Sequence, residues 1–124
     1  MDKAETNYVF KEKFVEVRNG ELIIKCYYFP ICTDKVVPVK DVRRLRYVKQ
    51  SNSYAKSWGS SGDPVWWACD MKRNFRQRSD EFYNVMIDDG KWLEKGFTVH
   101  DIVGFQRALR NDLQNCSIEA LPTY

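Results

Sequence analysis

The sequence predicts a mainly β protein of the α+β class: a small antiparallel barrel or orthogonal sandwich of about seven strands, closed by one C-terminal amphipathic helix. Segments in which apolar and polar residues alternate follow one another from residue 14 to residue 97, as in half-buried strands. A single helical stripe of apolar residues comes after them. Because this stripe has no second helix to pack on, we expect it to cover the strands.

The chain has 124 residues, which is the size of one domain. We expect that domain at residues 10–114, between a flexible N-terminus (1–9) and a C-terminal tail (115–124). Aromatic residues make up 15% of the chain, which suits a compact β core. No apolar run approaches the ~20 residues that span a membrane, and the polar N-terminus lacks an export signal. We therefore expect a cytoplasmic protein.

The first predicted element is a β-hairpin of residues 14–18 and 21–25. The intervening Asn19-Gly20 is the strongest short signal for a two-residue turn. A turn of that length fixes the register, so four apolar side chains share one face and an opposite-charge pair lies beside the turn. The apolar four are Val15, Val17, Leu22 and Ile24, and the charged pair is Arg18 with Glu21.

Further strands are predicted from alternation. They cover residues 26–29 (continuing the hairpin), 35–37, 43–48, 65–71 and 82–87, with a short candidate at 54–58. Pro38 limits its segment to a sheet edge or a strand end, and Asp89-Gly90 marks a second tight turn. The inward positions are Leu45 with Tyr47, then Val65, Trp67, Cys69 and Met71, and then Tyr83, Val85 and Ile87.

The helix is predicted to begin near Thr98 and to reach about Gln114. Thr98 with Asp101 three residues later resembles a capping box, with Asp in place of Glu. Gly104 lowers helix propensity by about 1 kcal/mol relative to Ala, so we expect close packing at that position. The apolar stripe consists of Ile102, Phe105, Leu109 and Leu113.

Four cysteines and one histidine restrict the possible chemistry. No C-x-x-C pair is present, so a structural zinc site is not expected, and no export signal argues for disulfides. We expect four reduced thiols, with Cys26 and Cys69 in the core. The lone His100 leaves no spare partner for Ser-His or Cys-His catalysis. We predict no metal, no cofactor and no enzymatic activity.

This order of elements resembles the pleckstrin-homology-like barrel over roughly residues 10–114. The resemblance rests on the element order, the first hairpin and the final helix, and it implies that the helix plugs one open end of a barrel. Lipid-binding members carry a basic cluster around the first hairpin loop, which here is only Asn19-Gly20. Many members also have a Trp in the final helix, where this chain has Phe105. Fold alone does not give function.

Two basic segments are candidate binding surfaces. Residues 35–49 carry six basic residues against Asp41, and alternation places Arg44 and Arg46 on one face, with Val48. The loop 72–78 places four cations around one aromatic, followed by Asp80 and Glu81. Both segments also fit an ordinary solvated surface. The loop candidates are Lys72, Arg73, Phe75, Arg76 and Arg78.

Trp66 is the third candidate, because alternation turns it outward, where a Trp can anchor an interface. Packing beneath the long loop of residues 50–63 is the competing interpretation.

Our leading hypothesis is a non-catalytic intracellular binding or adaptor module that acts through an unknown protein partner. Weak binding of anionic lipid or phosphoinositide is the first alternative. The second is a small-ligand carrier or enzyme that uses the open barrel end. The net charge of +3 is too small to indicate a nucleic-acid partner.

Overall fold

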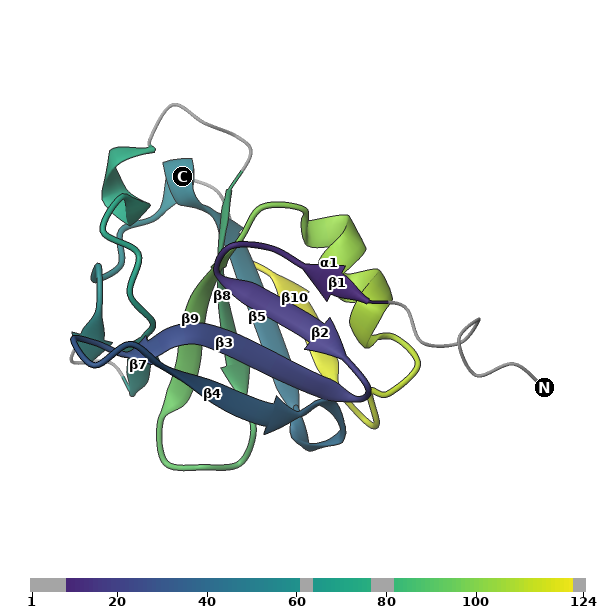
Figure 1. Ribbon diagram of the computed structural model, residues 1–124. Helices are drawn as coiled ribbons and strands as arrows, with labels where there is room; N and C mark the ends of the chain where they lie inside the picture. Colours follow the sequence, from purple (N-terminus) through teal and green to yellow (C-terminus); the bar gives the residue numbers. More distant parts are fainter. Residues whose placement is uncertain (1–8, 61–63, 77–81, 122–124) are drawn as a thin grey trace.

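The computed structural model describes residues 9–60, 64–76 and 82–121, which form two β-sheets and one α-helix (Figure 1). The predicted flexible N-terminus lies, up to residue 8, outside the described residues. The first sheet has the order β1-β2-β3-β4, with β1 Phe10–Lys11, β2 Val15–Arg18, β3 Glu21–Tyr28 and β4 Thr33–Pro38. The second has the order β10-β5-β8-β9-β7-β6, with β5 Arg44–Lys49, β6 Gly59–Ser60, β7 Val65–Trp67, β8 Tyr83–Asp88, β9 Glu94–Val99 and β10 Ser117–Ala120.

The prediction of a mainly β protein with one C-terminal helix is confirmed, but the prediction that all strands are antiparallel is wrong. In the described chain the two sheets are open and do not form a closed barrel. Two strand pairs, β7 with β9 and β5 with β10, are parallel. A parallel pair requires a long connection between its strands, and here β8 occupies that connection. Alternation within each strand says nothing about such crossovers.

The first hairpin is confirmed residue by residue. Val15 pairs with Ile24, Val17 with Leu22 and Arg18 with Glu21, and all four apolar side chains are buried. Asn19 and Gly20 have φ angles of 53° and 74°, as the favoured two-residue hairpin turn requires. β4 pairs with the far side of β3 and forms a sheet edge, in agreement with the position of Pro38.

The main core lies between the two sheets and beneath the helix, and both sheets and the helix contribute to one apolar cluster. α1 spans Ile102–Leu109 and buries Ile102, Phe105 and Leu109, so the predicted stripe is confirmed over the helix. The ring of Phe105 meets that of Phe10 in β1 at 5.7 Å and that of Phe97 in β9 at 5.7 Å. A Cβ on Gly104 would lie 3.3 Å from the Phe10 ring, which confirms the expected close packing.

The boundaries of the helix differ from the prediction. Asp101 is the N-cap, and its Oδ1 accepts a hydrogen bond from the backbone N of Gly104 at 2.9 Å. Thr98 does not cap the helix, because it lies buried in β9 with its hydroxyl bonded to Asp70. The helix ends at Leu109, so Leu113 lies beyond it, half-buried against the core.

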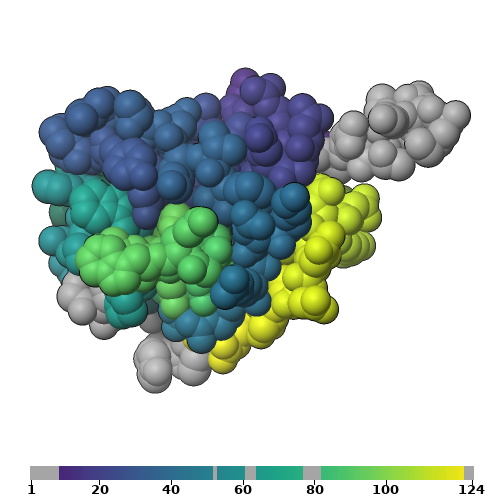
Figure 2. Space-filling view, turned by 90° about the horizontal axis from the view of Figure 1, so that it is seen from below, coloured from purple at the N-terminus to yellow at the C-terminus, as the bar shows by residue number. Residues whose placement is uncertain are grey.

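The predicted loose C-terminal tail is wrong for Ser117–Ala120, which form β10 along the edge of β5. Figure 2 shows this C-terminal segment (yellow) along one side of the molecule. All four side chains of β10 are exposed. Its alternation of polar and apolar residues covers only these four positions, which is a short signal for a strand. Residues 122–124 lie outside the described residues.

The expectation of four reduced cysteines is also wrong. Cys26 and Cys32 are joined by a disulfide across the turn between β3 and β4, where their Cα atoms lie 3.9 Å apart. Spacing in the sequence did not indicate this pairing, because an irregular stretch of β3 brings the two residues together. Cys26 and Cys69 are half-buried instead of core residues, and burial raises the pKa of the Cys69 thiol. Among the described helices, none has the length and apolar character needed to cross a membrane.

Candidate binding cleft

The second sheet has one face on the core and one face turned away from it, and register decides which side chains share the outer face. Arg46 lies opposite Met86, Met86 opposite Gly96, and Gly96 opposite Trp67. Since side chains alternate along a strand, Arg44 and Glu94 share this face with them. Residues far apart in the sequence therefore form a single surface across β5, β8, β9 and β7.

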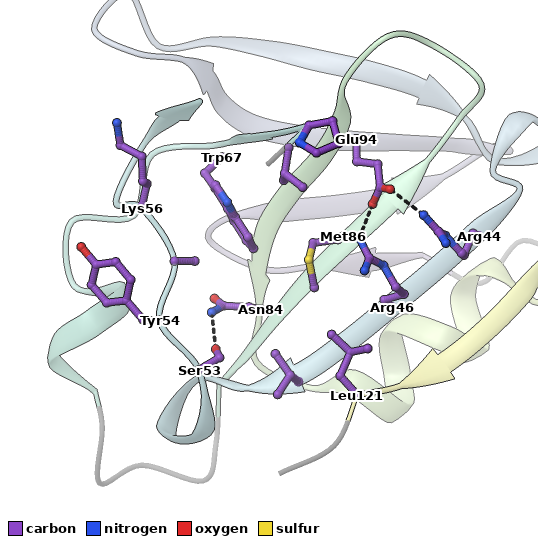
Figure 3. A pocket seen from close by; sticks show the side chains of 14 residues that line it. Arg44, Arg46, Ser53, Tyr54, Lys56, Trp67, Asn84, Met86, Glu94 and Leu121 are labelled. Atoms are coloured by element: carbon purple, nitrogen blue, oxygen red, sulfur yellow. Dashed lines mark hydrogen bonds and ion pairs between the residues drawn. The ribbon is translucent and has the colours of Figure 1, made fainter. Parts of the chain in front are cut away.

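A cleft of about 730 Å³ lies over this outer face, and residues 53–56 form one wall of it (Figure 3). Its floor is largely apolar, three charged side chains (Arg44, Arg46 and Glu94) gather at one end, and Lys56 lies apart from them (Figure 3). The apolar lining consists of Val48, Ala55, Pro64, Val65, Trp67, Met86 and Leu121, and the polar lining of Arg44, Arg46, Ser53, Tyr54, Lys56, Asn84 and Glu94.

Arg44 and Arg46 share one acceptor, the carboxylate of Glu94. Each donates from Nη2 to a different oxygen of Glu94 at 2.7 Å. The two side chains cross β8 to reach β9, because β8 lies between their strands. Glu94 is 13% exposed, whereas Arg46 is 25% and Arg44 is 43% exposed, so the cations remain accessible to a ligand. One carboxylate against two guanidinium groups leaves a local excess of one positive charge.

The Nε–H groups of Arg44 and Arg46 are buried and have no acceptor among the described residues. A buried N–H without a partner costs about 1–3 kcal/mol, so most native donors avoid this state. Within the described chain, the arginine pair is therefore not fully hydrogen-bonded.

Trp67 forms the opposite end of the cleft and lies flat on the sheet. A side chain at Gly96 would overlap the Trp67 ring, so glycine on the neighbouring strand gives the indole its space. Trp67 belongs to a second apolar cluster with Ala55, Val65 and Met86, separate from the main core. This small cluster supplies the apolar floor of the cleft.

Arg73 holds the cleft wall to the sheet from below. It is 1% exposed, and all five of its N–H groups are hydrogen-bonded. Burial lowers the pKa of Arg73 to about 10, which leaves it charged at neutral pH. Its guanidinium also lies 4.8 Å from the centre of the Trp67 ring. The acceptors are Asn84 Oδ1, Thr98 Oγ1 and the backbone carbonyls of Lys56, Ser57 and Ala68.

Asp70 completes this buried polar cluster. It accepts from both terminal nitrogens of Arg76, at 2.7 and 3.1 Å, and from the Thr98 hydroxyl at 2.6 Å. Burial alone would raise the pKa of Asp70, but the hydrogen bonds from Arg76 and Thr98 and the charge of Arg73 outweigh it, so the pKa lies below its usual range. Gln50 joins the cluster by donating to Asn84 and Thr98, each at 3.1 Å. Together these bonds fix the chain segments that form the cleft wall.

Of the predicted site residues that the structure describes, Arg44 and Arg46 alone line the cleft, and they share one face as predicted. Trp66 is not an exposed anchor. Its indole N–H donates to the Tyr27 carbonyl at 2.8 Å, and the ring packs on the main core. The prediction assigned the two faces of β7 the wrong way round. Trp66 packs on the main core, whereas Val65 and Trp67 pack on the other face of the sheet with Ala55.

The predicted basic loop is not a solvated surface of cations. Arg73 is buried and Arg76 is half-buried on Asp70, so neither offers a free charge. Lys72 is exposed, and Phe75 is 84% exposed. Arg78 lies outside the described residues. No local sequence pattern indicates that backbone carbonyls and buried polar side chains surround Arg73.

The structure adds Glu94, Met86 and Trp67 to the candidate site. Among these three residues, the sequence analysis singled out Trp67 alone, and it predicted that Trp67 lies in the core. No protein-family model, curated protein or solved structure matches this chain. No group of three or more His, Cys, Asp or Glu residues within the described ranges could hold a metal ion. The resemblance to the pleckstrin-homology-like barrel stays a prediction.

Proposed function

We propose that this protein is a non-catalytic binding module that acts through contact with a partner protein, and that its cleft receives an acidic segment of that partner. The observation that carries the proposal is the arginine pair, in which two accessible cations share one carboxylate at the end of an apolar floor. An acidic side chain next to an aliphatic or aromatic one would match both features. Charge-assisted bonds to arginine are among the stronger and more directional contacts in recognition.

The rim of the cleft supports a protein partner. Tyr54 is 79% exposed there, and tyrosine and arginine are both enriched at protein interfaces. The side chains also support a non-catalytic role. Among the described residues that line the cleft, none is histidine or cysteine. Glu94 is held between two arginines, so it is poorly placed to act as a general base.

A free small molecule with a carboxylate or phosphate is the second candidate. The cleft volume favours it, because small-molecule sites usually fall between about 300 and 1,000 Å³. This candidate is the predicted small-ligand carrier with its site moved from a barrel end to the outer face of a sheet. The lipid alternative loses support at residues 72–76, where Arg73 and Arg76 are bonded internally.

Selection from a random peptide library displayed on phage tests the proposal. We expect enriched peptides to carry Asp or Glu beside an apolar residue. Arg46→Gln should lower their affinity by about tenfold to a hundredfold, since a bond to a charged group contributes roughly 1.5–3 kcal/mol. Arg107→Gln, an exposed arginine on the helix, serves as the matched control and should leave the affinity unchanged.

Two outcomes of this experiment would count against a protein partner. Peptides that bind wild type and Arg46→Gln equally would mean that the arginine pair does not recognise them. Thermal stabilisation by aromatic carboxylates that Arg46→Gln abolishes, with no peptide enriched, would instead favour the small-ligand candidate.

A further inference from the structure

The loop between β8 and β9 carries the most exposed tryptophan that the structure describes. Trp92 is 88% exposed, and it follows the tight turn at Gly90, whose φ is 82°. In Figure 1 this loop extends beyond the strands that it joins, and Figure 2 shows it (green) at the surface beside blue residues. Tyr28 of β3 lies on the same shallow hollow and is 42% exposed. The Trp92 side chain therefore does not contribute to the packing of the hydrophobic core.

Four cations surround this loop: Lys35, Lys40, Arg43 and Lys91. Lys91 lines two adjoining hollows, one with Lys40 and Arg43 and the other with Lys35 and Trp92. The Arg43 guanidinium lies against the loop itself, within 2.7 Å of where a side chain at Gly90 would begin. No side chain of these four forms an ion pair or hydrogen bond with another described residue.

The acidic residues near the loop only partly offset these charges. Asp89 pairs with Lys95 at 3.1 Å, and Asp34 pairs with Lys25 at 3.3 Å. Asp41 and Asp88 have no cationic partner among the described residues. Four free cations against two free carboxylates leave this face with an excess of two positive charges around an exposed indole.

We propose that this face, formed by Trp92 with Lys35, Lys40, Arg43 and Lys91, docks on an anionic lipid surface. Tryptophan concentrates at the membrane–water boundary, where its ring is buried and its N–H stays hydrated. Clustered basic side chains are attracted to the anionic head groups. Three of the four cations are lysines, which are depleted from the centres of protein–protein interfaces. A protruding tip also fits a broad, deformable surface better than a rigid one.

Sedimentation with vesicles tests the inference on the full chain. Binding is expected to vesicles of phosphatidylcholine mixed with phosphatidylserine, to weaken as salt is raised, and to be absent with phosphatidylcholine alone. Trp92→Ala should lower the partition coefficient about tenfold, and each of Arg43→Gln and Lys91→Gln about fivefold. The blue shift of tryptophan emission on vesicle addition should disappear in Trp92→Phe.

Phe75→Ala is the matched control, because Phe75 is 84% exposed and lies outside this face. It should bind vesicles as wild type does, and so should the cleft variant Arg46→Gln, because the inference does not depend on the proposed cleft function. Equal loss in Phe75→Ala and Trp92→Ala, or no salt-sensitive binding, would overturn it. So would a shift of Trp92 emission with polyglutamate but not with vesicles, which would point to an acidic protein instead.

Discussion

Arg73 and the pair of Arg44 and Arg46 lie under and over the same cleft, yet they are satisfied in opposite ways. Arg73 is 1% exposed and bonds through all five of its N–H groups. Arg44 and Arg46 share one carboxylate, and the Nε–H group of each lacks an acceptor among the described residues. The supply of acceptors therefore separates a structural arginine from one that is available to a ligand.

The difference also corrects a common inference from sequence. A run of basic residues suggests a positively charged surface, but the charge is available only where internal acceptors are few. Around Arg73 the chain supplies three carbonyls and two side-chain oxygens. Around Arg44 and Arg46 the described part of the chain supplies only Glu94. The more basic-looking loop is therefore the weaker candidate for a binding surface.

The largest expected effect comes from removing the structural arginine. Arg73→Met should lower the free energy of unfolding by roughly 3–5 kcal/mol, because it leaves five acceptors without their donor and removes the nearby positive charge from buried Asp70. Urea denaturation followed by tryptophan fluorescence measures it. Lys72→Met, at the exposed neighbouring position, is the control and should unfold near the wild-type midpoint. Similar midpoints for the two variants would mean that Arg73 is solvated in solution.

Much of the fold could be predicted, because local rules govern it. Asn19-Gly20 fixed the hairpin register, and the stripe from Ile102 to Leu109 identified the buried side of the helix. The parallel pairing of β7 with β9 could not be predicted, because it joins residues about 30 positions apart with no local signal. β10 was missed because its alternation covers only four residues and its parallel partner β5 lies about 70 positions away.

A smaller effect is expected on the pH dependence of the free energy of unfolding at acidic pH. Because the folded pKa of Asp70 is lowered, its contribution is present above the unfolded value of about 3.9 and is lost as the pH falls through the folded pKa. Asp70→Asn should therefore lose less stability than wild type between about pH 5 and pH 2. Urea melts across this range measure the slopes. In an Arg76→Gln background, the difference in slope between the proteins with and without Asp70→Asn should become smaller. Equal slopes of unfolding free energy against pH in all proteins would contradict the pairing of Asp70 with Arg76.

The candidate site was only half predictable. Alternation along β5 placed Arg44 and Arg46 on one face, which the structure confirms. Their partner Glu94 depends on the order of β5, β8 and β9 in the sheet, and the cleft depends on a loop that Arg73 holds in place. A sequence read locally reveals which side chains share a strand face. It does not reveal what lies opposite them.

The smallest effect on stability is expected at Glu94. A substitution there tests directly whether Arg44 and Arg46 are more available to anions than Arg73. Glu94→Gln should change the free energy of unfolding by only about 1 kcal/mol, because both ion pairs are partly exposed. It should, however, free two guanidinium groups for an external anion. Sulfate, compared with chloride at equal ionic strength, should raise the Tm of Glu94→Gln more than that of wild type. Glu21→Gln, an exposed position of the first hairpin, removes the same charge away from the cleft and controls for net charge. An equal response of all three proteins to sulfate would show that Arg44 and Arg46 are no more available to anions than Arg73.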